Sequence, residues 1–386
     1  VPVALRIRGA VDLELLGRSL CALVGRHEVL RTRFVDVEGA AVAIVRELGA
    51  GDLDPRVAPE DDLSTLPEPA RLARAVTLAV EEARRPFDLT DDLLVRVRVW
   101  RLDVNDLVLL LSMHHIVSDG WSLGVLVPEL GALYDAFRRQ APSPLPELSL
   151  QYADYAVWQR GWLEREALDT QLAYWRRQLD GVPSALELPT DRARPPTQSY
   201  AGRNVTFEVD AAPLARLRAL GREHDATLFM TCLAVFGVLL WRYTSQDDLV
   251  IGSPIANRTR RETEPLVGFF VNTLALRADL SGNPSFLVLL DRVRQTALDA
   301  YAHQDLPFER LVDELQPERD LSLNPLFQVM FAVQNAPVEP LEVGGLHVEP
   351  LDLPARSALF DLVLDLWETG DTLTGNLQFN TDLFDD

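Results

Sequence analysis

Lysine is absent from this sequence, and all 37 basic residues are arginines. This absence excludes a Walker A phosphate-binding loop, a Schiff-base lysine for pyridoxal phosphate and a Ser-Lys catalytic pair. Cysteine is nearly absent too, and Cys21 and Cys232 both lie in apolar stretches, so we expect buried, unreactive thiols. Because two cysteines build no disulfide framework and no signal-peptide pattern is seen, a cytoplasmic location is expected.

Positive charge is scarce, and long apolar runs are missing. The 37 basic residues face 58 acidic ones, and the net charge of −21 argues against nucleic acid or an anionic membrane as a partner. The longest apolar run, residues 228–241, contains Thr231 and is shorter than the roughly 20 residues that a membrane span needs. We predict a buried helix there, capped by Thr227.

The length and the 47% hydrophobic content suit a globular chain of two lobes that mix helices and strands. We expect an N-terminal lobe at 1–180 and a C-terminal lobe at 203–386. The stretch 181–202 is rich in Pro, Arg and Asp and lacks periodicity, so it is the predicted linker.

A hairpin precedes the most informative motif. Residues 95–100 alternate valine with arginine or tryptophan, and the turn 103–106 leads to the nearly all-apolar strand 107–113. A helix should follow at 122–138, kinked or delayed by Pro128. The other predicted elements are strands at 3–8, 248–252, 326–334, 360–367 and 373–380, and helices at 12–25, 67–84, 214–223, 228–243 and 286–302.

Two adjacent histidines end this apolar strand. If the strand continues through the motif, His114 and His115 point to opposite faces, which disfavours a shared metal ion, and no further ligands with zinc-like spacing occur nearby. Each could simply be a satisfied core residue. However, Asp119 can bond its own turn or pair with an arginine, and Gly120 permits a backbone that a side chain would block. This combination favours a functional histidine at position 115.

A serine nucleophile is the rival interpretation. Ser118 and Ser122 flank Asp119, but neither lies in a Gly-x-Ser-x-Gly elbow. Ser122 is more simply explained as a helix N-cap.

Six ordered blocks resemble the core motifs of the condensation domains of non-ribosomal peptide synthetases. They are RHEVLRTRF at 26–34, HHIVSDGWS at 114–122, YADYAVW at 152–158, IGSPIANR through VGFFVNT at 251–273, HQDLPFE at 303–309 and RDLS onward at 319–331. The family usually opens with a further Ser-x-Ala-Gln-type motif and continues into more helix, and neither is found here.

The resemblance implies an α/β fold of two chloramphenicol-acetyltransferase-like lobes in a V-shaped pseudo-dimer with a central tunnel. The histidine motif would lie midway along the tunnel on the N-terminal lobe. Two segments of the C-terminal lobe would bridge the cleft: a floor loop at about 253–272 and a latch at about 335–359.

The resemblance also implies an acyltransferase that forms peptide bonds without an acyl-enzyme. A donor acyl or peptidyl thioester and an acceptor aminoacyl thioester would arrive on phosphopantetheine arms of upstream and downstream carrier domains. No cofactor would be bound by the chain itself, no metal is expected, and the arm would enter near Gly120. The chain would be one unit of a multidomain synthetase, beside an adenylation domain.

The implied roles fall on the histidine motif and its surroundings. His115 would position or deprotonate the acceptor amine, and His114 would pack behind the strand. Asp119 would hold the loop through an arginine, with Arg258 as the first choice and Arg26 or Arg31 as alternatives. The backbone around Gly120 would stabilise the oxyanion.

Three further assignments follow from the same blocks. Trp121 would pack at the contact between the lobes rather than stack on a substrate, and Ser122 would support the loop. The motif variants resemble the subtype that joins an L-configured donor to an L-configured acceptor. A non-catalytic docking module and a free-standing, coenzyme A-dependent acyltransferase are the alternatives.

Overall fold

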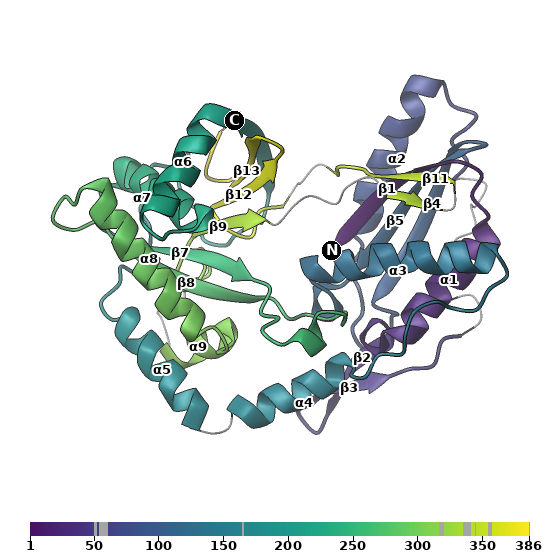
Figure 1. The fold of residues 1–386 in the computed structure, drawn as a ribbon, viewed down its shortest axis with the longest axis horizontal. Coiled ribbons are helices and arrows are strands. Elements are labelled where there is room, and N and C mark those ends of the chain that lie inside the picture. The colour runs from purple at the N-terminus through teal and green to yellow at the C-terminus, as the bar shows by residue number, and fades with distance from the viewer. Residues whose placement is uncertain are drawn as a thin grey trace. The chain divides into compact units, whose positions relative to one another are not determined.

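The computed structural model describes residues 1–49, 52–53, 61–163, 166–315, 320–334, 341–343, 345–353 and 357–385 (Figure 1). Contacts between Cα atoms divide the chain into two units. The first contains Val1–Arg160, Arg258–Phe270 and Val338–Leu353, and the second contains Gly161–Asn257, Val271–Pro337 and Pro354–Asp386.

An antiparallel five-stranded sheet forms the centre of the first unit. The order of its strands is β10 (Leu341–Val343), β11 (Leu346–Pro350), β1 (Pro2–Arg8), β5 (Asp106–Met113) and β4 (Val95–Asp103). The predicted hairpin is confirmed, since β4 and β5 pair across a tight turn. Strand β5 lies inside this sheet, between β1 and β4, and every one of its residues but the first is buried.

Helices cover both faces of this sheet. Helices α1 (Leu13–Arg26) and α3 (Gly120–Arg138) pack together, and Leu20 of α1 shares a core cluster with Leu109 of β5. Helix α2 (Glu68–Ala83) packs on the other face, where Ala79 meets Leu110. The alternating direction of side chains along β5 therefore distributes successive leucines between two cores. The remaining elements are η1 (Glu28–Arg31), β2 (Thr32–Val37), β3 (Ala40–Val45), η3 (His115–Val117), α4 (Tyr152–Leu163) and η4 (Arg261–Thr263).

The second unit is built on a mixed six-stranded sheet. Its order is β6 (Gly202–Val209), β13 (Thr372–Asn380), β12 (Leu362–Thr369), β9 (Val329–Gln334), β7 (Asp248–Ile255) and β8 (Asn272–Asp279). Strand β9 runs parallel to both of its neighbours, and the other pairs are antiparallel. The last two strands, β12 and β13, form an antiparallel hairpin.

Helices α6 (Ala211–Glu223), α7 (Leu228–Thr244) and α8 (Phe286–Ala302) pack on this sheet and on one another. Helices α5 (Glu166–Gln178) and α9 (Phe308–Leu315) complete the unit. Thr227 caps α7 as predicted, since its side chain accepts a hydrogen bond from Met230 N–H. In the described part of the chain no single helix is long and apolar enough to cross a membrane. Among the described helices, the pair α6 and α7 passes that test when taken together, and the two are bent by 109°.

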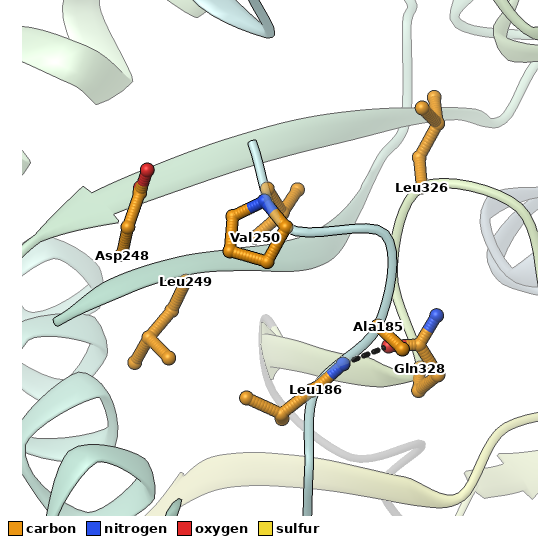
Figure 2. A pocket seen from close by; sticks show the side chains of 8 residues that line it. Ala185, Leu186, Asp248, Leu249, Val250, Leu326 and Gln328 are labelled. Atoms are coloured by element: carbon orange, nitrogen blue, oxygen red, sulfur yellow. Dashed lines mark hydrogen bonds between the residues drawn. The ribbon is translucent and has the colours of Figure 1, made fainter. Parts of the chain in front are cut away.

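Residues 181–201 contain no helix, and they are built into the second unit. Leu186 N–H donates to Gln328 Oε1 at 2.6 Å beside a small pocket (Figure 2). Arg194 forms a bidentate ion pair with the buried carboxylate of Asp361. Because α5 also groups with this unit, the division in the structure falls earlier than the predicted boundary at residue 180.

Of the two predicted bridging segments, the floor loop is described throughout and the latch only in part. Residues 258–270 of the expected floor loop group with the first unit. Of the expected latch, positions 335–340, 344 and 354–356 lie outside the described residues, whereas β11 pairs with β1 in the first unit.

Two local predictions were wrong. Helix α3 begins at Gly120 rather than at Ser122, because Asp119 caps it, so Pro128 does not delay its start. Cys21 is exposed, whereas Cys232 is buried as expected. The reason is that Leu16, Leu20 and Leu23 form the inward face of α1, which leaves Cys21 on the outer face.

Candidate active site

The histidine motif lies just beyond the end of β5. The chain leaves the strand at Met113 and forms the short 3-10 turn η3 before α3 begins. The side chain of His115 is exposed, and its Nδ1 lies 2.8 Å from the carbonyl oxygen of Ser118. Because a carbonyl oxygen can only accept, Nδ1 carries the proton, and the lone pair of the neutral ring is on Nε2.

His114 has the opposite tautomer. Its Nδ1 accepts a hydrogen bond from Ile116 N–H at 3.1 Å, so the proton of the neutral ring is on Nε2. The ring is half-buried and meets Phe87 edge-on. Burial lowers the pKa of His114 below its usual value. His114 is therefore held neutral as a cap of η3.

Both histidines line one pocket of about 370 Å³, together with Pro2, Phe87 and Ser112 among others. The predicted separation of the two rings onto opposite faces of the strand does not hold. The alternation of a strand ends at Met113, and His115 already belongs to η3. Within the described ranges, no three His, Cys, Asp or Glu side chains lie close enough together to hold a metal ion.

Asp119 is buried and caps α3. Its Oδ1 accepts hydrogen bonds from Ser122 N–H at 2.9 Å and from Ser122 Oγ at 2.7 Å. The reciprocal bond from Asp119 N–H to Ser122 Oγ, at 3.3 Å, completes a capping box. The predicted N-cap, Ser122, is thus the third residue of the helix, and the cap itself is Asp119.

The charge of Asp119 is balanced by Arg258. Arg258 Nη2 lies 3.2 Å from Asp119 Oδ1, and the two side chains are 1% and 2% exposed. The alternatives pair elsewhere. Arg26 donates to Glu129, and Arg31 donates to Glu28 and to the carbonyl oxygen of Arg46.

Arg258 also anchors its own segment. Its Nη1 donates to the carbonyl oxygens of Thr263, at 2.5 Å, and Leu266, at 2.7 Å. The guanidinium carbon lies 4.0 Å from the centre of the Phe270 ring, which is a favourable cation–π distance. Burial lowers the pKa of Arg258, and the nearby Asp119 carboxylate raises it.

Gly120 is exposed at the first position of α3. Its φ is not positive, and a Cβ added there would meet nothing within 4 Å. The predicted reason for a glycine here, a backbone that a side chain would block, is therefore wrong. What Gly120 provides is open space beside the histidine motif.

Trp121 is 43% exposed, and its indole N–H donates to the carbonyl oxygen of Glu264 at 3.0 Å. Trp121 thereby joins α3 to the same segment that Arg258 organises.

Two residues that the sequence analysis did not single out complete this region. Tyr152 of α4 donates its hydroxyl to the carbonyl oxygen of Phe269 at 2.8 Å. The Phe269 ring meets the His115 ring edge-on, with 5.0 Å between their centres. Both residues lie in blocks that were noted only for their resemblance. The spacing of 117 residues between them carries no signal in a single sequence.

Comparison with known proteins identifies the family of the chain. Residues 1–386 match the family described as Condensation domain. The chain is 49% identical over 387 residues to one of the linear gramicidin synthase subunits of Brevibacillus parabrevis, with 100% of the chain and 8% of that protein covered. It therefore spans less than a tenth of the length of this relative.

Solved structures share the fold. The X-domain from teicoplanin biosynthesis is 30% identical and superposes with a TM-score of 0.89, covering 100% of this chain and 86% of that one. The condensation domain from the monacolin K polyketide synthase MokA is 22% identical with a TM-score of 0.82, covering 100% and 87%, which shows the fold alone. The chain belongs to the condensation-domain family of the non-ribosomal peptide synthetases.

Proposed function

We propose that this chain forms amide bonds between two carrier-bound substrates. The α-amine of an acceptor aminoacyl thioester attacks the carbonyl carbon of a donor acyl or peptidyl thioester. A carbon–nitrogen bond forms, the carbon–sulfur bond breaks, the amine loses one proton, and the donor's phosphopantetheine thiol is released. The sequence variants favour L-configured substrates on both sides, and the cofactor arms are those of the carriers.

One observation carries the proposal: the fixed tautomer of His115. The bond from Nδ1 to the Ser118 carbonyl leaves the Nε2 lone pair on a ring that lines the pocket. That lone pair can accept a hydrogen bond or a proton from the attacking amine. An α-amine has a pKa of about 8, so a useful fraction is already neutral, and orientation of the amine is the larger contribution.

The serines of the motif support direct transfer without an acyl-enzyme. Ser118 Oγ is buried and makes no hydrogen bond within the part of the chain that the structure describes. Ser122 Oγ is buried too, and it is occupied by Asp119 and by Gly268 N–H at 3.1 Å. Neither hydroxyl has the adjacent base and the free approach that a nucleophile needs.

The surrounding residues take supporting roles in this proposal. Asp119 and Arg258 hold the start of α3 against residues 258–270, and Ser122 and Trp121 add bonds between the same two segments. The exposed N-terminus of α3 at Gly120 presents the positive end of a helix dipole, which suits a developing oxyanion.

The test is a single-turnover assay with two separate carrier domains. Donor and acceptor carriers are loaded with a panel of L-amino acids, and dipeptidyl thioester on the acceptor carrier is measured by mass spectrometry. We expect product with wild type and a fall of about 10²-fold or more with His115→Ala. His224→Ala is the matched control, because His224 is an exposed histidine at the C-cap of α6.

The alternatives predict different outcomes in the same assay. A His115→Ala variant that condenses at the wild-type rate would contradict the proposed role. A docking module would bind a tailoring enzyme in a pull-down and give no dipeptide with any carrier pair. A coenzyme A-dependent acyltransferase would turn over acetyl-CoA with both carriers omitted.

A further inference from the structure

In the part of the chain that the structure describes, the imidazole of His115 makes a hydrogen bond and a ring contact. One hydrogen bond, from Nδ1 to the Ser118 carbonyl, fixes the tautomer, but the side chain is exposed and can still tilt about that bond. The Phe269 ring packs edge-on against it at an interplanar angle of 77°, with 5.0 Å between the ring centres. This distance is within the range of favourable aromatic pairs, so Phe269 restricts the tilt.

The position of Phe269 is itself fixed by a clamp on one peptide group. The carbonyl oxygen of the Phe269–Phe270 peptide accepts a hydrogen bond from Tyr152 Oη at 2.8 Å. The N–H of the same peptide donates to Asp119 Oδ2 at 3.0 Å. Because both polar atoms of this peptide are bonded to side chains, its plane is defined, and with it the direction of the Phe269 side chain.

Tyr152 has little freedom to move. Its ring lies against the backbone of Gly268, where an added Cβ would come within 2.2 Å of Tyr152 Cδ2. The ring also meets the buried Phe270 ring edge-on, with 5.0 Å between their centres. Burial raises the pKa of Tyr152 above its usual value, and the phenol therefore stays protonated and donates at all working pH values.

We propose that Tyr152 and Phe269 are positioning residues for His115: the phenol fixes the peptide, the peptide aims the phenylalanine ring, and that ring holds the imidazole toward the substrate amine. This inference rests on the proposed function of His115. A positioning role differs from a purely structural one, because it predicts that substitutions of Tyr152 or Phe269 change the environment of the His115 imidazole.

Tyr152→Phe tests the clamp with the smallest change, since it removes one hydroxyl and keeps the ring. With the most active carrier pair from the panel above, we expect kcat to fall about tenfold and KM to change little. A tenfold change corresponds to about 1.4 kcal/mol of lost positioning. Tyr155→Phe is the matched control, because it removes a hydroxyl that accepts a hydrogen bond from Gln159 in the same helix.

The second measurement is the ¹⁵N NMR spectrum of the imidazoles, with His115 assigned by its loss in His115→Asn. We expect the His115 resonances to shift or broaden in Tyr152→Phe and to stay in place in Tyr155→Phe. Phe269→Leu removes the ring contact directly and should move the same resonances. Circular dichroism checks that each variant is folded.

Unchanged His115 resonances in both Tyr152→Phe and Phe269→Leu would overturn the inference, whatever the activity. Shifted resonances with wild-type kcat would also overturn it, because the orientation would then have no consequence. The NMR result does not depend on turnover. It therefore distinguishes a failure of the clamp from a failure of the proposed function, which would appear as wild-type activity in His115→Ala.

Discussion

Asp119 and Arg258 are 139 residues apart in the sequence and form a buried ion pair in the first unit. The pair does more than neutralise charge. Asp119 caps α3 and accepts from Phe270 N–H, and Arg258 donates to two carbonyl oxygens of its own segment. The loop after the histidine motif and residues 258–270 are therefore one hydrogen-bonded network, and the positions of both depend on it.

Removing the guanidinium should be costly. In Arg258→Met the buried Asp119 carboxylate loses its counter-charge, and the carbonyl oxygens of Thr263 and Leu266 lose their donor. We expect the free energy of unfolding, measured in urea, to fall by about 3–5 kcal/mol. Arg176→Met is the control, because the Arg176–Glu314 pair is largely exposed and should contribute about 0–1 kcal/mol. Equal effects of the two substitutions would contradict the structural role.

Gly120→Ala separates folding from catalysis. A Cβ at this position meets nothing within 4 Å and needs no change of φ. We expect the free energy of unfolding to stay level or rise by about 0.4–1 kcal/mol, because alanine restricts the unfolded chain. The rate of dipeptide formation should fall, because the methyl group occupies space beside the histidine motif. Wild-type turnover in this variant would show that the substrates do not use that space.

Gly268→Ala should disturb the clamp by steric pressure. The new methyl group would overlap the Tyr152 ring, which is confined by Phe270 and cannot swing away freely. Overpacking of this kind costs about 1–3 kcal/mol, measurable as a lowered midpoint of urea unfolding. Gly161→Ala is the control, since an added Cβ on that glycine of α4 meets nothing within 4 Å. A fully stable Gly268→Ala would show that Tyr152 is not confined.

The stability of the chain should depend on pH through His114. Burial lowers the pKa of His114 in the folded state below its unfolded value of about 6.5, so the unfolded state binds more protons between the two values. The contribution of neutral His114 to stability is therefore complete above a pH of about 6.5, and it is lost as the pH falls through the pKa of the folded state. Protonation also removes the lone pair that accepts from Ile116 N–H.

His114→Asn isolates this effect, because the amide oxygen can replace Nδ1 as the acceptor and does not titrate. Urea unfolding at about pH 7.5 and about pH 5.5, on either side of the unfolded pKa, should show a larger loss for wild type than for the variant. The same pH dependence in both proteins would mean that His114 is not responsible.

Local patterns decided much of the fold. The alternating valines of β4 and the apolar run of β5 specify a hairpin with two buried faces, and Thr227 marks the start of α7, because these signals depend on neighbours in the chain. Strand β6 is not predicted, because a local pattern is lacking. Six of its eight residues are exposed, so buried and exposed residues do not alternate along it, and its pairing with β13 defines it as a strand.

The sequence by itself determined the family, the chemistry of the histidine motif and the need of Asp119 for a cationic partner. It could not choose among Arg258, Arg26 and Arg31, because all three carry the same charge and distance along the chain says nothing about distance in space. The tertiary structure made that choice, and it also placed His114 and His115 on one pocket and brought Tyr152 and Phe269 to the imidazole. Each of these contacts depends on where the backbone points the two side chains. Those orientations meet only after segments distant in the sequence have packed together.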